Sequence, residues 1–287
     1  MKTIVVFTDH SKQSEHAARY AMHLAKKIKA NVLLSDAIKM PNRVLALRAV
    51  RSNDSFEEQE PPDNNSLLTF CGLLENELLE NTLPGKFSPA IYCQPDEMAL
   101  DEVISYFEEN LDVAFIVLAA NLYYGTSTIM AGVTCGEILT ISNIPVILVP
   151  EDAPIRYAEK YAFVADIDNS NISTLTHITK LADCSAAEVM LVNINTGRPL
   201  DEDQENALRS IMKETITQID YGRIYYRHLP NSVSKSDVEW LMQDNKFEIL
   251  VVVHHKNNKN SPLLKFDYSG KMVGNINVPL LIYPAID

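Results

Sequence analysis

The stretch NIPVILVP at residues 143–150 decides the fold, because it recurs as NVPLLIYP at residues 277–284. Each copy is a short apolar run between two prolines, which is typical of a buried strand that must stop at the second proline. The beginnings also correspond, since IVVFTDHS at residues 4–11 parallels YAFVADID at residues 161–168. Both runs end in an aspartate and lead into polar residues suited to begin a helix. Two matched ends in the same order predict an internal duplication.

Strand and helix patterns alternate inside each copy. In the first copy we expect helices over 13–28, 65–82, 97–109 and 132–142, with strands over 30–35, 90–93 and 113–118 between them. In the second we expect helices over 173–181, 205–218, 233–242 and 266–274, with strands over 188–193, 223–227 and 249–253. Apolar strands alternating with helices predict an α/β fold with a parallel sheet covered on both faces. Five strands per copy indicate a flavodoxin-like or related doubly wound sheet.

The duplication predicts two domains, one over residues 1–151 and one over residues 157–287, joined by a short linker. The first copy is longer because residues 38–66 contain a polar stretch with little helical pattern. We interpret this stretch as a long surface loop, with a functional lid as the alternative.

Charge and composition exclude several function classes. The net charge of −13 without a cluster of Lys and Arg argues against nucleic-acid binding. No window approaches the ~18 apolar residues needed to span a bilayer, and the apolar run at the N-terminus is too short for a signal peptide. The four cysteines are scattered without a C-x-x-C pair, which favours reduced thiols over a disulfide framework. We therefore expect a cytoplasmic protein with no membrane partner.

The sequence resembles the universal stress proteins. The resemblance rests on residues 5–11, on AARYA at 17–21 and LAKK at 24–27, and on residues 143–150, with residues 164–167 and 278–281 in the second copy. It covers essentially the whole chain and implies a tandem of two fused domains. Each domain is then flavodoxin-like (adenine nucleotide alpha hydrolase-like) and doubly wound. The resemblance also implies a role in the stress response, and a pseudo-dimer in which Val146–Val149 meets Leu280–Tyr283. A homodimer of whole chains is left open.

Nucleotide-binding members of this family carry G-x-x-G, a nine-residue gap and G-[ST] after the fourth strand. Glycines there let backbone N–H groups approach phosphates closely. Counted back from the proline of the last strand, the three glycine positions hold Ala119, Leu122 and Gly132 in the first copy, and Val253, Lys256 and Phe266 in the second. The motif is therefore eroded in the first copy and absent from the second.

The resemblance still implies candidate cofactor-binding residues. In the first domain these are Asp9, Gly125, Gly132 and Thr134, which would hold ATP or another adenine nucleotide; weaker candidates in the second domain are Asp166 and Lys256. The alternative role for both aspartates is structural, because an aspartate at a strand end often caps the following helix.

Other candidate chemistry is sparse. His10 and the pair His254–His255 lie at expected strand ends, but adjacent histidines on a strand point in opposite directions, so we predict no metal site. Cys135, near the start of a helix, is either a redox-sensing thiol or a small buried side chain. No nucleophile elbow, P-loop or triad order is present, so we predict no catalytic residue.

We interpret the chain as a stress-responsive binding or regulatory protein with a degenerate nucleotide site and no strong catalytic activity. One alternative is an adenine-nucleotide-binding protein with slow ATP hydrolysis at the first domain. Another is a module that binds an unknown small molecule or protein partner in the altered pockets.

Overall fold

The computed structural model describes residues 1–36, 64–82, 85–94, 99–120, 128–130, 133–165, 172–194, 202–229, 246–254 and 278–285. Three expectations lie wholly or mostly outside these residues: the surface loop, of which only 64–66 are described, and the helices over 233–242 and 266–274.

Helices and strands alternate along the whole chain. The first half contains β1 (Thr3–Thr8), α1 (Lys12–Ile28), β2 (Asn31–Asp36), α3 (Asn64–Glu80), β3 (Ile91–Gln94), α4 (Leu100–Asn110), β4 (Val113–Ala120), β5 (Thr128–Met130), β6 (Val133–Thr134), α5 (Cys135–Ile141) and β7 (Val146–Pro150). The second half contains β8 (Lys160–Ala165), α6 (Ile172–Asp183), β9 (Glu188–Ile194), α7 (Glu202–Thr217), β10 (Ile224–Leu229), β11 (Ile249–His254) and β12 (Leu280–Pro284). The α/β alternation predicted from the sequence is confirmed.

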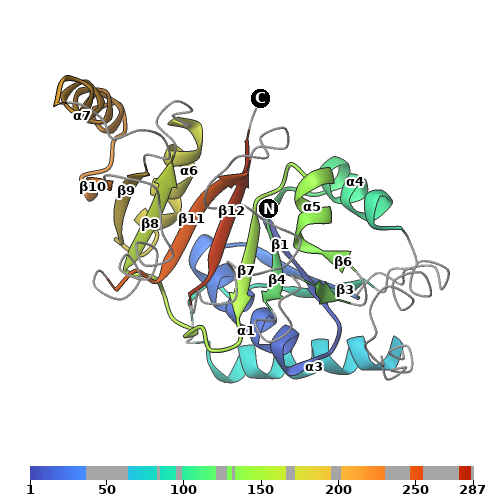
Figure 1. Cartoon of the computed structure of the whole chain (residues 1–287). Coiled ribbons are helices and arrows are strands. Elements are labelled where there is room, and N and C mark those ends of the chain that lie inside the picture. The colour runs from blue at the N-terminus through green and yellow to red at the C-terminus, as the bar shows by residue number, and fades with distance from the viewer. Residues whose placement is uncertain are drawn as a thin grey trace.

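One ten-stranded sheet runs through both halves in the order β10-β9-β8-β11-β12-β7-β4-β1-β2-β3 (Figure 1). Each half contributes five strands in the order third, second, first, fourth, fifth, and every pairing within a half is parallel. The sheet is doubly wound, but its third strand lies at the edge, whereas the flavodoxin order 2-1-3-4-5 keeps that strand inside. The strand order therefore reverses between β1 and β4, and between β8 and β11.

The two halves meet at their last strands. β12 pairs antiparallel with β7, with Leu281 opposite Ile147. These strands contain the two proline-flanked runs that would meet according to the family resemblance. Both strands are buried along their whole length. Each therefore has a neighbour on both sides in the sheet and leaves no open edge at the centre of the molecule.

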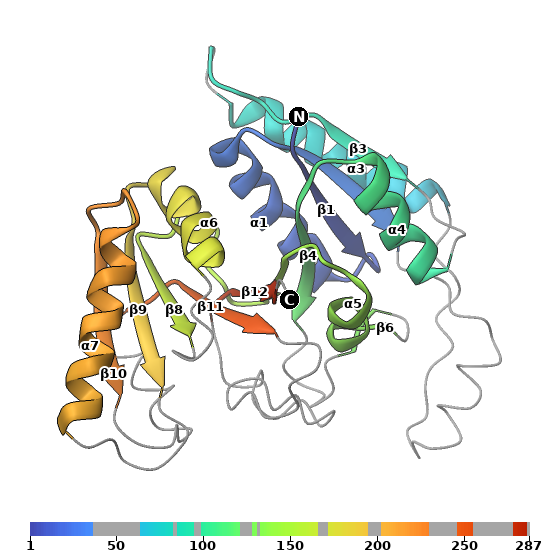
Figure 2. The same cartoon turned by 90° about the horizontal axis from the view of Figure 1, so that it is seen from above.

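Helices cover both faces of this sheet in the first half, and in the described part of the second half α6 and α7 cover one face (Figures 1 and 2). Alternate residues of a strand point to opposite faces, so Ile4 and Val6 pack with α1 and α3, while Val5 and Phe7 pack with α4 and α5. The first of these two cores also contains buried residues of α6 and α7. It is continuous across the two halves.

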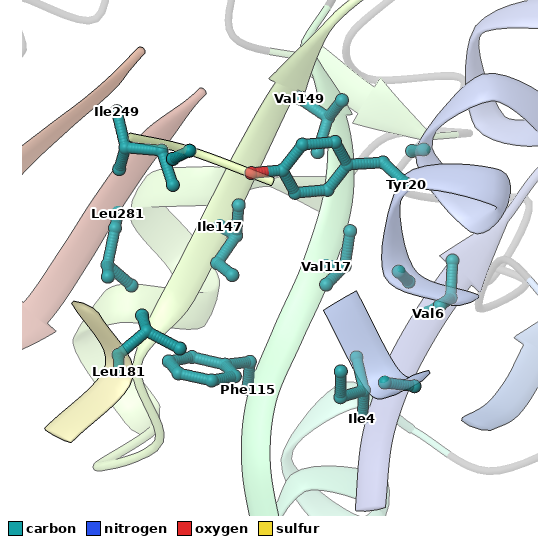
Figure 3. Close-up of a cluster of buried hydrophobic side chains, with 14 of the residues drawn as sticks. Ile4, Val6, Tyr20, Phe115, Val117, Ile147, Val149, Leu181, Ile249 and Leu281 are labelled. Atoms are coloured by element: carbon teal, nitrogen blue, oxygen red, sulfur yellow. The ribbon is translucent and has the colours of Figure 1, made fainter. Parts of the chain in front are cut away.

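Figure 3 shows this continuity at the centre of the molecule. Tyr20, from α1 of the first half, extends toward Ile249 of β11 and Leu281 of β12. Burial, together with the negative charge of Glu248, raises the pKa of the Tyr20 hydroxyl. Tyr20 therefore stays neutral in the core.

Three helix starts differ by three residues from the sequence-based expectation. The helix expected from residue 205 begins at Glu202. The helix expected from residue 132 begins at Cys135, because residues 128–130 and 133–134 form two short strands, β5 and β6, that pair antiparallel. The β-branched residues of this stretch favour strand. The helix expected from residue 97 begins at Leu100, where the Glu102 carboxylate accepts the N–H of Ala99 at 3.4 Å.

Candidate functional site

The carboxyl ends of β1 and β4 border the point where the strand order of the first half reverses. In open α/β sheets, ligands bind in the crevice beyond such strand ends. β1 ends at Thr8 and is followed by Asp9, while β4 ends at Ala120. Asp9 is half-buried at this position.

Asp9 organises the turn that joins β1 to α1. Its Oδ1 accepts a hydrogen bond from the backbone N–H of Ser11 at 3.0 Å. Ser11 is the N-cap of α1, and its hydroxyl oxygen accepts the N–H of Ser14 at 3.2 Å. The alternative role expected for Asp9, capping of the following helix, is therefore wrong. Ser11 caps α1, and Asp9 holds the turn before the cap.

His10, between these two residues, adopts a left-handed conformation with φ of +61°. This region is uncommon for residues other than glycine, although histidine is among those that enter it more often. The backbone of the turn is therefore held by its surroundings, at the edge of the sheet where a ligand would bind.

Two buried hydroxyl groups lie behind the turn and were not expected from the sequence. The hydroxyl of Ser14 donates to the carbonyl of Ser11 at 2.9 Å, and its oxygen lies 3.0 Å from the hydroxyl oxygen of Thr8. Because Ser14 has already used its only proton, Thr8 donates to Ser14. The Thr8 oxygen in turn accepts the N–H of His10 at 3.1 Å. The sequence signal that could have indicated these hydrogen bonds is the regular spacing of the hydroxyl residues Thr8, Ser11 and Ser14 around Asp9.

The first glycine position of the nucleotide motif lies inside the sheet in both halves. Ala119 is a residue of β4, pairs with Val149 of β7 and is 5% exposed. Val253 is a residue of β11, pairs with Tyr283 of β12 and is 9% exposed. Both residues therefore belong to a strand and not to a loop around a phosphate.

The other predicted site residues are not brought together by the part of the chain that the structure describes. Gly125, Gly132, Asp166 and Lys256 lie outside the described residues. Thr134 is the last residue of β6, with its backbone opposite Thr128 of β5.

Two residues were considered for other chemistry, one as a redox-sensing thiol and one as a metal ligand. Cys135 is the first residue of α5, and His254 is the last residue of β11. Within the described ranges, no three His, Cys, Asp or Glu side chains gather in a way that would hold a metal ion. No helix within the same ranges is long and apolar enough to cross a membrane.

Comparison with known proteins identifies the family. The universal stress protein family model matches residues 1–150. Two solved structures are similar over nearly the whole chain. A universal stress protein from Archaeoglobus fulgidus DSM 4304 has a TM-score of 0.61 and 13% identity, covering 99% of this chain and 97% of that one. A protein of unknown function from Pseudomonas aeruginosa PAO1 has a TM-score of 0.56 and 12% identity, covering 98% and 92%.

No curated protein matches the sequence. At such low identities the two solved structures show a shared fold and nothing of the ligand. The family model, in contrast, matches the sequence itself over more than half of the 287 residues. The matched region contains β1, the Asp9 turn and the proline-flanked β7, and on this basis the chain belongs to the universal stress protein family.

Proposed function

We propose that this chain is a stress-responsive binding or regulatory protein whose nucleotide site is degenerate and which does not hydrolyse ATP at an appreciable rate. The observation that carries the proposal is the position of Ala119, buried within β4 where the family's phosphate motif would begin. The stress-related role is inferred from family membership.

The physical argument concerns the backbone. A phosphate-binding loop presents several N–H groups to the anion, and glycines allow the close approach. The backbone of Ala119 is instead part of the sheet beside β7. The same holds for Val253 beside β12 in the second half. The sequence has no glycine at either position, nor at residues 122, 256 and 266.

Asp9 supports binding of a different ligand at the same place. Among the described residues, the Asp9 carboxylate accepts a hydrogen bond from Ser11, and a carboxylate has the capacity to accept several more. A ligand hydroxyl or amine at the carboxyl end of β1 would donate a hydrogen bond to this negatively charged carboxylate. Hence the proposed ligand is a small molecule with hydrogen-bond donors and without a triphosphate.

The second candidate function is adenine-nucleotide binding, with slow ATP hydrolysis at the first domain. The half-buried Asp9 beside the reversal of strand order favours it. The two candidates differ in whether a triphosphate binds, which makes them separable.

The division into domains 1–151 and 157–287, forming a pseudo-dimer, is part of the same proposal. It is supported by the identical strand order of the two halves and by the antiparallel pairing of β7 with β12.

Calorimetry with Mg·ATP on the full chain tests the proposal. The informative variant is Asp9→Asn, because the amide oxygen still accepts the Ser11 N–H while the negative charge is removed. Asp112→Asn is the matched control. Asp112 is exposed and directly precedes β4, so it lies at the amino end of this strand, whereas Asp9 lies at the carboxyl end of β1. We expect no saturable binding of Mg·ATP to any of the three proteins.

Native mass spectrometry of small molecules carried through purification is the second measurement. We expect a ligand other than a nucleoside triphosphate, retained by Asp112→Asn and lost from Asp9→Asn. Saturable Mg·ATP binding that Asp9→Asn abolishes and Asp112→Asn keeps would overturn the proposal in favour of the nucleotide-binding alternative.

A further inference from the structure

Helix α3 and the edge strand β3 bring two cysteines into one layer of the core. Five residues on one side of α3 are buried: Leu67, Phe70, Cys71, Leu74 and Leu78. On β3, Ile91 is buried and Cys93 packs against the same cluster, while Tyr92 between them is 54% exposed. Strand alternation therefore points Cys93 to the face that α3 covers.

The two cysteine side chains are neighbours within this layer, because α3 packs on β3 and Cys93 is part of the electrostatic surroundings of the Cys71 thiol. Burial, followed by this neighbouring thiol, raises the pKa of Cys71 to about 12. Cys71 is therefore protonated and unreactive toward reagents in solution.

Cys93 is the accessible member of the pair. It is half-buried, whereas Cys71 is 7% exposed. Among the described strands, β3 is the last of the sheet and pairs with β2 alone. A small reagent therefore reaches Cys93 more readily than Cys71.

We propose that Cys71 and Cys93 form a reversible disulfide that ties α3 to the edge strand β3 when the protein meets a low-molecular-weight disulfide of the glutathione type. Cys71 lies on the buried side of α3, and Cys93 packs against the same cluster from the β3 side of the helix–strand interface.

The reaction has two exchange steps. The Cys93 thiolate attacks one sulfur of the small disulfide, the S–S bond breaks, and one small thiolate leaves and takes a proton from water. The Cys71 thiol then gives its proton to solvent as its sulfur attacks Cys93 in the mixed disulfide, releasing the second small thiolate, which is protonated. The two cysteines lose two electrons and two protons, and the small disulfide is reduced to two thiols.

The other cysteines supply an internal control. Cys184 is exposed and donates to the carbonyl of Lys180 at 3.4 Å. In the part of the chain that the structure describes, no cysteine lies beside it. Cys184 therefore forms a mixed disulfide and stops there. Replacing Cys135 by Ser leaves Cys71, Cys93 and Cys184 as the reacting thiols.

The test uses the folded full chain carrying Cys135→Ser. It is incubated with oxidised glutathione, quenched with acid, alkylated, and analysed by intact mass and peptide mapping. We expect a Cys71–Cys93 cross-linked peptide and one glutathione on Cys184, both reversed by dithiothreitol. In a Cys135→Ser chain that also carries Cys71→Ser, we expect Cys93 to keep its glutathione. With Cys93→Ser added, Cys71 stays unmodified.

Circular dichroism of the chains that also carry Cys71→Ser or Cys93→Ser shows whether they are folded when oxidised glutathione is added. Stable glutathione on Cys93 of the parent chain, without the cross-linked peptide, would overturn the proposal, because Cys71 would then have failed to resolve the mixed disulfide. Modification of Cys71 at the rate of Cys184 would also overturn it, since the buried thiol would not be protected.

Discussion

His23 on α1 faces the segment that connects the two halves. Its ring stacks on that of Tyr157, with centroids 4.0 Å apart, and the Lys27 ammonium lies 4.4 Å from the centroid of the Tyr157 ring. Its Nε2 is buried and has no hydrogen-bond partner among the described residues. Burial, followed by the positive charges of Lys26 and Lys27, lowers the pKa of His23.

Protonation of His23 should weaken the folded state. Its pKa is lower in the folded chain than in the unfolded chain, so the unfolded chain binds the proton more readily. The stability due to neutral His23 is complete above its ordinary pKa of about 6.5 and is lost as the pH falls through the lower, folded value. The other charges at this contact, Arg156 and Glu248, are paired with each other.

We therefore expect His23→Phe, which keeps a ring against Tyr157, to lose less stability than the native chain on acidification. Urea unfolding at about pH 8 and about pH 5 measures this, because histidine changes its charge between these values. At the higher pH, the difference in free energy of unfolding between the two proteins gives the cost of the altered packing and serves as the control. Equal losses on acidification would show that His23 does not contribute.

At the scale of the element, β12 connects the two halves of the sheet. It pairs with β11 in parallel and with β7 in antiparallel register, and every residue of Leu280–Pro284 is buried. Leu281, at the centre of the strand, is 1% exposed and packs in the core shown in Figure 3. Loss of its side chain leaves a cavity between residues of both halves.

Leu281→Ala should cost about 2–5 kcal/mol, as is typical of a leucine deletion in a core that relaxes only in part. The matched control is Leu79→Ala on α3, since Leu79 is 73% exposed; there we expect a change within about 0.5 kcal/mol. Equilibrium urea unfolding measures both. Similar costs for the two variants would contradict the central position of β12.

At the scale of the whole molecule, each half covers the last strand of the other. In the intact chain β7 has β4 on one side and β12 on the other. Residues 1–150 alone would present β7 as an open edge of buried apolar residues. Such an edge is a template for pairing with another chain.

We therefore expect the fragment 1–150 to self-associate, whereas the same fragment carrying Ile147→Lys associates less, because a charge on an edge strand opposes pairing. Sedimentation velocity over a range of concentrations measures this, with circular dichroism as the control for folding. A folded fragment that stays monomeric throughout would show that β7 does not need β12.

Local patterns were enough to predict most of the elements. The apolar spacing that predicted a helix over 13–28 matches α1 at Lys12–Ile28, and the proline-flanked run at 143–150 contains β7. The short pair β5–β6 was missed because two- and three-residue strands carry no periodicity to detect. At such sites the choice between helix and strand rests on contacts outside the segment.

The site was only partly predictable for the same reason. The sequence identified Asp9 at a strand end and the loss of the motif glycines. It left the helix cap open between Asp9 and the polar residues that follow it, and it did not predict that Thr8 and Ser14 bond behind the turn. A hydrogen bond depends on distance and direction, and the order of residues fixes neither.

The sequence by itself determined the α/β alternation and predicted the duplication and the erosion of the phosphate motif, because each depends on the order of residues along the chain. Only the tertiary structure decided that the halves share one sheet through β7 and β12, that Ala119 lies inside a strand, and that Cys71 and Cys93 are neighbours. These contacts join residues far apart in the chain. They form only when burial of the apolar faces outweighs the entropy of closing the intervening loops.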